Sequence, residues 1–450
     1  MIQMRLTDLS NILNVKEINS GQTFKGISVN SRDTMPSNLF VAIKGTRFDG
    51  HDYVKEAADK GAIAAVVERF NPKLSIVQLV VSDTLKALGD LASVWRAKFI
   101  VPVIGITGSV GKTTVKEMIG SILSQLGSCL ISQGNMNNEI GLPLTLFSIQ
   151  KDTDFVVVEM GAAKNGDIDY LAKIAKPNIG VITCCAPAHL ENLESLENVA
   201  ITKGALVSNL PSDGIAILNR EDKFFDYWEG INSSSNLISF GDNGDCFSSE
   251  ELTQANSSSF QVNCQSFTGK VKIGQLGKHN IKNALAAVAI SCALGVDFDT
   301  VAKGLMKTPK IFGRLFWVKG GRFNILDDSY NSNPRALSAA IDVLCFEKGE
   351  KWIVLGDMLE LGLNAQDLHD ESIIKMNEAG VNRLFTIGSF SAKSSLHFER
   401  ISENFTDIND LISRLRALIR ASENKVSVLI KGSRAFNLDL VVEALKEANV

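Results

Sequence analysis

A glycine-rich run between an apolar strand and a helix constrains the fold of this chain more than any other feature. The run is Ile104-Gly105-Ile106-Thr107-Gly108-Ser109-Val110-Gly111-Lys112-Thr113-Thr114. Gly108 and Gly111 let backbone N–H groups point at phosphate oxygens, and the helix N-terminus adds positive potential. Lys112 can then reach the β- and γ-phosphates, and Thr113 can ligate magnesium. The run predicts a nucleotide-binding loop, although Ile106 replaces the first glycine of the general motif.

The pattern around this loop predicts a doubly wound sheet. From Phe99 the chain reads as strand, glycine-rich turn and a helix beginning near Val115. Further buried-strand runs follow at 155–159 and 178–183. We therefore expect a central phosphate-loop domain over residues 98–312.

A smaller α/β domain is expected before this one and a Rossmann-like domain after it. Over residues 1–97, short apolar runs alternate with turns, as at 38–45 and 61–67. Over residues 313–450, strand and helix patterns alternate again. The strands of this last domain are predicted near 323–326, 351–355, 383–387 and 427–430.

One segment of the central domain lacks a clear element. Residues 232–259 are rich in Ser, Asn, Asp and Gly and carry only weak strand signals. We expect this segment to be a variable insertion without a chemical role.

Composition limits the class of protein. With 450 residues, 45% hydrophobic and 21% charged, the chain can bury more than one core. Its net charge of -4 gives no basic field for nucleic acid or an anionic membrane. The N-terminus lacks an apolar signal region, and no apolar run reaches the roughly 18 residues that span a bilayer. The seven cysteines have no C-x-x-C spacing and include the adjacent Cys184 and Cys185, so we expect reduced thiols and a cytoplasmic location.

Motifs in all parts of the chain resemble those of the Mur ligases, a family that shares its short phosphate loop with folylpolyglutamate synthases. The similarity is strongest to the branch that joins D-alanyl-D-alanine to UDP-N-acetylmuramoyl-tripeptide, a precursor of peptidoglycan. The runs that carry it are Gly134-Asn135-Met136-Asn137-Asn138-Glu139-Ile140-Gly141, Ala186-Pro187-Ala188-His189-Leu190-Glu191, Gly277-Lys278-His279-Asn280, Asp327-Asp328-Ser329-Tyr330-Asn331-Ser332-Asn333-Pro334, Gly356-Asp357-Met358-Leu359-Glu360-Leu361-Gly362 and Lys431-Gly432-Ser433-Arg434. They occur in family order.

The resemblance implies a catalytic set of Lys112, Glu159, His189 and Lys203. Glu159 ends a strand beside the phosphate loop and would hold magnesium together with Thr113 and His189. Lys203 matches the lysine that the family carbamylates, which turns a cation into a carboxylate-like ligand for the second of two magnesium ions. On sequence alone, His189 would be read as a packed or surface histidine and Lys203 as a solvated lysine of the helix predicted over 195–209.

The resemblance also implies separate ATP and substrate positions. In the family, the arginine and the aspartate of the ATP set reach ATP from the last domain when it closes. The predicted ATP-binding residues are Gly108, Ser109, Gly111, Lys112, Thr113, Thr114, His279, Asn280, Asn283, Arg314 and Asp328. The predicted substrate-binding residues are Ser31, Arg32, Lys44, Gly45, Asn137, Asn138, Tyr330 and Asn331.

The implied reaction is formation of an amide at the expense of ATP. A carboxylate must first acquire a leaving group, so the γ-phosphoryl group would pass to the tripeptide carboxylate, and the dipeptide amine would then displace phosphate. Positioning and electrostatics dominate such a reaction, and no nucleophilic serine or cysteine is needed. The expected partners are small molecules only, and the expected state is a monomer.

Several departures from the branch pattern leave details of the substrate and metal contacts open. Ala163-Lys164 replaces Asn-His, Asp167 replaces Glu, Ala205 replaces Glu and Asn30 replaces Asp. Alternatives are a ligase that adds the third residue, diaminopimelate or lysine, or a scaffold that uses nucleotide without ligation. Asn333-Pro334-Arg335 superficially resembles a motif of the former branch, but lies far upstream of where that branch has it. The third residue of the tripeptide and the tolerance for other acceptors stay open.

Overall fold

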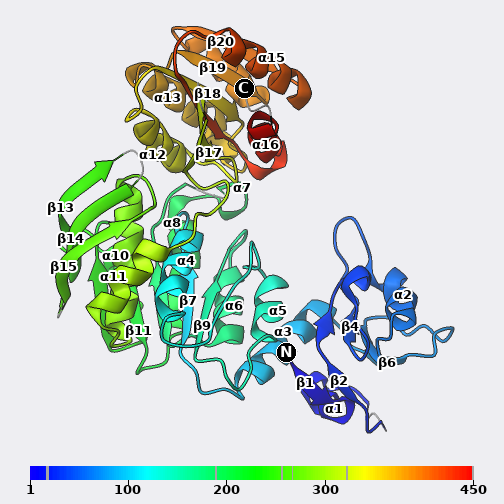
Figure 1. The fold of residues 1–450 in the computed structure, drawn as a ribbon. Helices are drawn as coiled ribbons and strands as arrows, with labels where there is room; N and C mark the ends of the chain where they lie inside the picture. The colour runs from blue at the N-terminus through cyan, green and yellow to red at the C-terminus, as the bar shows by residue number, and fades with distance from the viewer. Residues whose placement is uncertain (17–19, 188–189, 255–256, 266, 321–322, 448–450) are drawn as a thin grey trace.

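The computed structural model describes residues 1–16, 20–187, 190–254, 257–265, 267–320 and 323–447. Within these residues the strands form four sheets, of two, four, nine and six strands. Figure 1 shows them as three bodies, with the chain running from a small N-terminal part through a central part to the C-terminal part. The predicted three-part α/β architecture is therefore confirmed, and each sheet lies within one of the predicted domain ranges.

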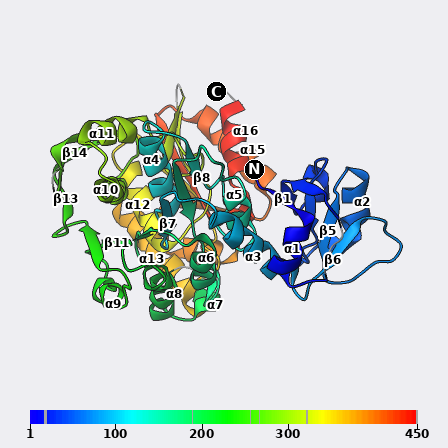
Figure 2. The same cartoon turned by 90° about the horizontal axis from the view of Figure 1, so that it is seen from below.

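The N-terminal part is a parallel four-stranded sheet in the order β3-β4-β5-β6, beside a two-stranded antiparallel sheet of β1 and β2. Asp83 begins the connecting helix α3, because its carboxylate accepts hydrogen bonds from the first backbone N–H groups. Seen from below, this part is attached to one side of the central part near α3 and β1 (Figure 2). Its elements are β1 (Gln3–Arg5), α1 (Leu6–Leu13), β2 (Thr23–Lys25), β3 (Ile27–Ser28), η1 (Ser31–Asp33), β4 (Leu39–Val41), η2 (Gly50–Tyr53), α2 (Val54–Asp59), β5 (Ala64–Val67), β6 (Val77–Val80) and α3 (Thr84–Arg96).

The central sheet has the order β15-β14-β13-β12-β11-β10-β7-β9-β8. Its strand pairs are parallel from β8 to β13, and β14 and β15 extend it as antiparallel strands. Its strands are β7 (Val103–Thr107), β8 (Cys129–Ile131), β9 (Phe155–Glu159), β10 (Ile179–Ile182), β11 (Ile215–Asn219), β12 (Asn236–Phe240), β13 (Cys246–Gln254), β14 (Ser257–Cys264) and β15 (Phe267–Ile273). Its helices are α4 (Lys112–Leu123), α5 (Gly141–Leu146), α6 (Asp167–Ala175), α7 (Leu190–Leu193), α8 (Leu196–Ser208), α9 (Phe225–Gly230), α10 (Lys278–Ala293) and α11 (Phe298–Lys307).

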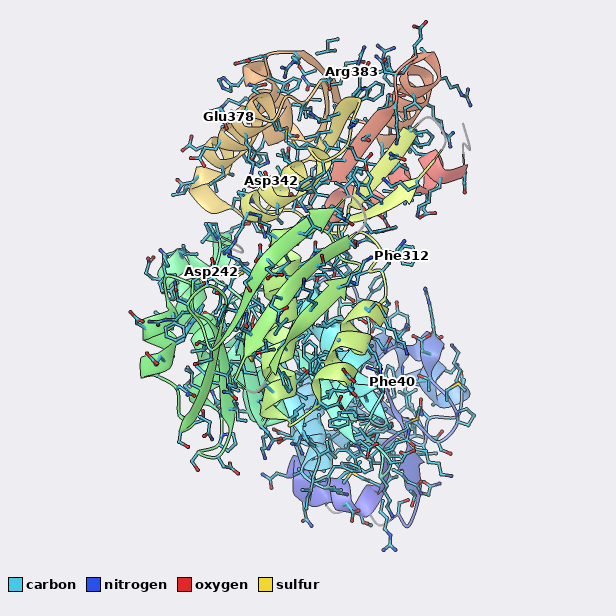
Figure 3. The ribbon with its side chains drawn as sticks, turned by 60° about the vertical axis from the view of Figure 1, so that its left-hand side comes forward. Phe40, Asp242, Phe312, Asp342, Glu378 and Arg383 are labelled. Atoms are coloured by element: carbon cyan, nitrogen blue, oxygen red, sulfur yellow. A yellow bond between two sulfur atoms is a disulfide. The ribbon has the colours of Figure 1, made fainter. Side chains whose placement is uncertain are left out.

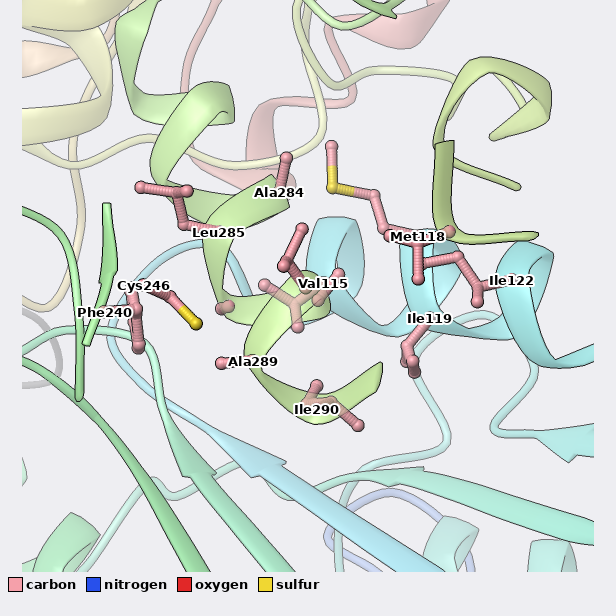
Figure 4. Packing of buried hydrophobic residues seen from close by; sticks show 14 of the residues in the cluster. Val115, Met118, Ile119, Ile122, Phe240, Cys246, Ala284, Leu285, Ala289 and Ile290 are labelled. Atoms are coloured by element: carbon pink, nitrogen blue, oxygen red, sulfur yellow. The ribbon is translucent and has the colours of Figure 1, made fainter. Parts of the chain in front are cut away.

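Helices cover both faces of the central strands, which explains their continuous apolar runs. Figure 4 shows one of these contacts, where Met118 and Ile122 of α4 pack with Ala284 and Leu285 of α10. Every residue of β7 is buried. This packing fixes the strand that leads into the phosphate loop.

The polar segment at 232–259 is part of the central sheet, so its weak strand signals correspond to strands of the fold. It contains β12, β13 and the start of β14. Strand β14 alternates buried and half-buried residues, because one face packs on the core and the other faces solvent. That arrangement allows serine and asparagine at every second position, which hid the strands in the composition.

The C-terminal sheet has the order β16-β17-β21-β18-β19-β20 and is parallel except for β16. The four strands predicted for this part are present as β17, β18, β19 and β21, and two further strands, β16 and β20, flank them; Asp328 ends β17. The elements are β16 (Phe316–Lys319), β17 (Phe323–Asp328), α12 (Pro334–Leu344), β18 (Glu350–Gly356), η3 (Gly362–Asn364), α13 (Ala365–Glu378), β19 (Arg383–Ile387), α14 (Ser389–Ser394), η4 (Ser395–His397), β20 (Ile401–Phe405), α15 (Ile408–Ala421), β21 (Val426–Lys431), η5 (Arg434–Phe436) and α16 (Asp439–Glu447).

The cysteines differ in part from the expectation of reduced thiols. Cys246 of β13 and Cys264 of β14 face each other across the antiparallel pair and form a disulfide. The other five cysteines are free thiols, as expected. The sequence could not indicate this pair, because only the strand register brings the two residues together. Among the described residues, no helix is long and apolar enough to cross a membrane.

Candidate active site

A cavity of about 700 Å³ lies between the central and C-terminal parts. On the central side it is lined where β7, β9, β10 and β11 end, and on the other side where β17 and β21 end. Strand β7 has β9 and β8 on one side and β10 on the other, so the cavity opens at the switch point of the sheet, where doubly wound proteins bind ligands. Figure 3 shows Phe312 at the junction of the two parts.

The cavity brings together most of the predicted site residues. All the predicted ATP-binding residues line it. So do Glu159, Lys203, Asn137, Asn138, Tyr330 and Asn331. Residues distant in sequence therefore meet at one place, as the motifs predicted. His189 lies outside the described residues.

Two glycines of the phosphate loop are required by their surroundings. Gly111 has φ +88°, and a Cβ there would lie 2.4 Å from Oδ1 of Asn283. At Gly108, with φ +148°, a Cβ would lie 1.8 Å from Oγ1 of Thr183, whose hydroxyl donates to the Val110 carbonyl at 2.5 Å. The backbone thus folds tightly against β10 and α10, and α4 begins at Lys112, three residues earlier than predicted.

Lys112 is held over this loop. Its Nζ donates to the carbonyl of Gly108 at 2.7 Å. Burial lowers the pKa of Lys112, the nearby Glu159 opposes this change and Arg314 adds to it. A cation in this place is directed at the part of the cavity where a phosphate chain would lie.

Glu159 forms a preorganised oxygen site next to the loop. It is 3% exposed, and its two carboxylate oxygens accept from Thr113 Oγ1 at 2.8 Å and from Asn137 Nδ2 at 2.9 Å. A carboxylate and a hydroxyl are ligands that magnesium prefers, and magnesium usually takes only one or two protein carboxylates, with water and phosphate as its other ligands. The donor set therefore fits a magnesium ion that is shared with a nucleotide. No group of three or more His, Cys, Asp or Glu side chains that could hold a metal occurs among the described residues.

Lys203 is a buried amine that faces the same cavity. It lies on α8 and is 4% exposed. Burial, followed by the charge of Lys112, lowers its pKa to about 7. Within the described part of the chain, its Nζ has no hydrogen-bond or ion-pair partner. A lysine in this environment is readily neutral, in contrast to the solvated lysine that the sequence alone suggests.

The N-terminal turns of α10 supply three of the predicted ATP-binding residues, His279, Asn280 and Asn283. Asn280 donates to the carbonyl of Leu276 at 2.7 Å and accepts from Asn283 at 2.8 Å. Burial lowers the pKa of His279 to about 4, so its ring is neutral at pH 7. Together they form a fixed, uncharged polar wall.

Arg314 and Asp328 reach the cavity from the C-terminal side. The guanidinium of Arg314 stacks 4.3 Å from the ring of Tyr330. Asp328 forms an ion pair with Lys431, whose Nζ also donates to the Asn331 carbonyl at 2.9 Å. Burial raises the pKa of Asp328, and the charge of Lys431 opposes this effect.

Four predicted substrate residues lie elsewhere. Ser31, Arg32, Lys44 and Gly45 belong to the N-terminal part and do not line the cavity. Lys60 donates to the backbone carbonyls of Ser31 at 2.9 Å and of Arg32 at 3.3 Å, which fixes the turn that carries them. A substrate that contacts both places must be extended.

Sequence reasoning assigned no role to several cavity residues. Thr183 follows the end of β10, Asn219 ends β11, and Lys431 ends β21. A polar residue at the carboxyl end of a buried parallel strand was the signal that could have indicated them. Of the departures from the branch pattern, Asp167 lines the cavity and accepts from the backbone N–H groups of Ala163 and Lys164, both at 2.9 Å, so it holds its loop in place.

Comparisons with known proteins cover the chain in three segments. The model of the Mur ligase family catalytic domain matches residues 23–96, that of the Mur ligase middle domain residues 106–291, and that of the Mur ligase glutamate ligase domain residues 313–434. A protein of Escherichia coli (strain K12), named UDP-N-acetylmuramoyl-tripeptide--D-alanyl-D-alanine ligase, is 37% identical over 99% of both chains.

Solved structures give the same result. A crystal structure of MurF from Acinetobacter baumannii superposes with a TM-score of 0.95 at 32% identity and 99% coverage of both chains. MurF ligase from Thermotoga maritima, solved in complex with ADP, gives a TM-score of 0.85 at 28% identity, with 94% of this chain and 98% of that chain covered. The likeness therefore extends over all three parts.

Proposed function

Because this chain belongs to the Mur ligase family, we propose that it joins D-alanyl-D-alanine to UDP-N-acetylmuramoyl-tripeptide in an ATP-dependent reaction. The observation that carries the proposal is the single cavity that joins the phosphate loop, Glu159 and Lys203 to Arg314 and Asp328 of the C-terminal part. The full-length relative with this name and the matching fold support the same activity.

The geometry supports an acyl-phosphate route. The γ-phosphoryl group of ATP would lie by Lys112, whose cation offsets the charge that spreads over the transferring group. The tripeptide carboxylate attacks phosphorus and ADP leaves. The amine of the dipeptide then attacks the acyl carbon, loses a proton and displaces orthophosphate. The chain positions these groups and forms no covalent bond to them.

Magnesium, if bound, would be held by Glu159 and Thr113, and it would neutralise the phosphate oxygens. We propose that Lys203 carries a carbamate, which would supply a second anionic ligand for magnesium. His189 would supply a further ligand. The buried position of the Lys203 amine, which has no partner among the described residues, supports this assignment, because a carbamate forms only from a neutral amine.

We further propose that the UDP-linked end of the substrate binds the N-terminal turn of Ser31 and Arg32 together with Lys44 and Gly45, and that the domains extend over 1–97, 98–312 and 313–450. The substrate peptide would then reach the cavity near Asn137 and Asn138. We expect the enzyme to act as a monomer in the cytoplasm.

Phosphate release tests the proposed activity. With ATP and magnesium, phosphate should appear only when both a UDP-muramoyl-tripeptide and D-alanyl-D-alanine are present, and the product mass should be that of the amide. A panel that includes tripeptides with diaminopimelate or lysine, and single amino acids as acceptors, identifies the third residue. Phosphate release without an acceptor would indicate a nucleotide-driven scaffold. Product formation from a UDP-muramoyl-dipeptide plus diaminopimelate or lysine would indicate the alternative ligase.

Domain closure gives a second test. The two parts already touch in the structure, where the Glu191 backbone N–H donates to the Glu360 carbonyl at 3.4 Å. We expect small-angle scattering of the protein with an ATP analogue and UDP-tripeptide to match the profile calculated from this structure, and the ligand-free protein to be more extended. Arg314→Ala should reduce the contraction, whereas Arg383→Ala, at the far end of the C-terminal part (Figure 3), should not. Identical profiles for the wild type and Arg314→Ala with ligands would contradict the role of Arg314 in closure.

A further inference from the structure

A buried lysine behind the phosphate loop has no role in the mechanism above. Lys116 lies on α4, three residues after Thr113, and is 1% exposed. Its Nζ donates to the backbone carbonyl of Ser132 at 2.7 Å and pairs with Glu117 Oε1 at 3.0 Å. Burying a cation is costly unless it gains strong partners, so its contacts determine what it does.

The face of α4 that carries Lys116 is directed at β8. Figure 4 shows the apolar residues of this helix packed on α10. One turn after Lys116, a Cβ on Gly120 would lie 3.0 Å from Ile131, the last residue of β8. The lysine therefore reaches past the end of β8 to the segment that follows it.

Ser132, whose carbonyl accepts from Lys116, also contacts the backbone of Glu159, the candidate metal ligand. It is 1% exposed, and its hydroxyl accepts from the backbone N–H of Glu159 at 3.1 Å. Ser132 begins the segment that carries Asn137, whose amide donates to the Glu159 carboxylate at 2.9 Å. Two contacts thus join this segment to Glu159, one at its backbone and one at its side chain.

These contacts form a continuous path from the helix to the carboxylate. Thr113, on the same helix as Lys116, donates to Glu159 directly. The bond from Lys116 to Ser132 closes a ring of contacts, which runs from α4 to Ser132, from Ser132 to Glu159, and through Thr113 back to α4. A hydrogen bond from a charged donor is shorter and stronger than one between neutral groups, so Lys116 can fix the spacing between the helix and the segment after β8.

We propose that Lys116 is a positioning residue that aligns Glu159 with Thr113 for magnesium-nucleotide binding. It does not touch the nucleotide and acts through Ser132. This inference rests on the proposed ATP site at the phosphate loop and adds a residue to it. Partners that orient a metal ligand typically change metal affinity by roughly 10- to 100-fold when they are removed.

The test is magnesium-dependent binding of an ATP analogue, measured by titration calorimetry on the full chain. Lys116→Met keeps the length of the side chain and removes the charge, and Ser132→Ala removes the hydroxyl that accepts from Glu159. We expect both variants to need about tenfold more magnesium for half-maximal binding of the analogue. Analogue binding in EDTA and binding of the UDP-linked substrate should stay as in the wild type. Glu117→Gln, which keeps the bond between Lys116 and Ser132, is the matched control and should keep the wild-type magnesium requirement.

A wild-type magnesium requirement in Ser132→Ala would overturn the proposal, and so would one in a folded Lys116→Met, even with a lowered melting temperature. If Lys116→Met does not fold, Ser132→Ala decides, because it removes a single atom. A wild-type chain that binds no magnesium-nucleotide at all would instead refute the proposed ATP site. The two failures are therefore distinguishable.

Discussion

Lys112→Ala is expected to lower the rate of ATP-dependent ligation by at least about a thousandfold. Lys112 holds the only side-chain cation of the phosphate loop, and its Nζ is fixed on the Gly108 carbonyl at 2.7 Å. Alanine removes this charge from the transferring phosphoryl group and cannot recruit water to replace it in a half-buried position. Phosphate release at saturating substrates measures the effect.

Binding of the UDP-linked substrate should hardly change in the same variant, because Ser31 and Arg32 of the N-terminal part lie outside the cavity. Calorimetric titration with the UDP-tripeptide measures this binding separately from turnover. Lys151→Ala, which removes an exposed lysine away from the cavity, should behave as the wild type. Turnover of Lys112→Ala within tenfold of the wild type would show that another loop carries out the chemistry.

The fold was predictable wherever a strand is buried on both faces. Strands β9 and β19 match their predicted ranges residue for residue, because such strands appear in the sequence as uninterrupted apolar runs. Strands β12, β13 and β14 gave only weak signals, because one face is solvated and polar residues interrupt the pattern. The pairing of Cys246 with Cys264 was missed for a related reason, since it depends on the register of two of these strands.

The residues of the candidate site were predictable from motifs, but their burial and their contacts were not. The motifs named the residues that line the cavity, but they could not show that Thr183 makes a side chain impossible at Gly108. They also could not identify Lys116, which looks like any helix lysine until β8 is placed beside it. Burial and contacts between distant residues are properties of the folded chain.

Lys203 shows this difference most clearly. Helix α8 was predicted at 195–209 and observed at Leu196–Ser208, with Ser195 as its N-cap. Helix periodicity alone did not indicate that Lys203 faces inward. Its neighbours Thr202 and Gly204 are buried as well, so the buried positions of α8 do not form one narrow stripe. The structure makes it a buried amine next to a second cation, and this environment favours the uncharged form.

Lys203→Ala should be nearly inactive, and we expect part of this loss to come from the missing carbamate group. Formate or acetate should restore some turnover by placing a carboxylate in the vacated space. Lys203→Arg should not recover, since a guanidinium stays charged and cannot form the carbamate. Ile201→Ala, on the exposed side of the same helix, is the control and should stay active. Full activity of Lys203→Ala in bicarbonate-free buffer would remove the carbamate from the mechanism.

The dependence on pH separates a carbamate from a purely structural role of Lys203. With a pKa of about 7, about half of the amines are neutral at pH 7, against roughly one in a few thousand at the ordinary pKa of lysine. Activity should therefore respond to added bicarbonate near neutral pH and fall as pH drops below 7, where the amine is protonated. In buffer free of carbon dioxide, the unfolded chain binds one more proton than the folded chain between pH 7 and the ordinary lysine pKa. The free energy of unfolding of the wild type should then rise with pH across this window, and Lys203→Met should lack that contribution. Denaturant titrations at several pH values measure this free energy. If it changed with pH equally in the two proteins, Lys203 would titrate as a solvated lysine, and the carbamate would lose its support.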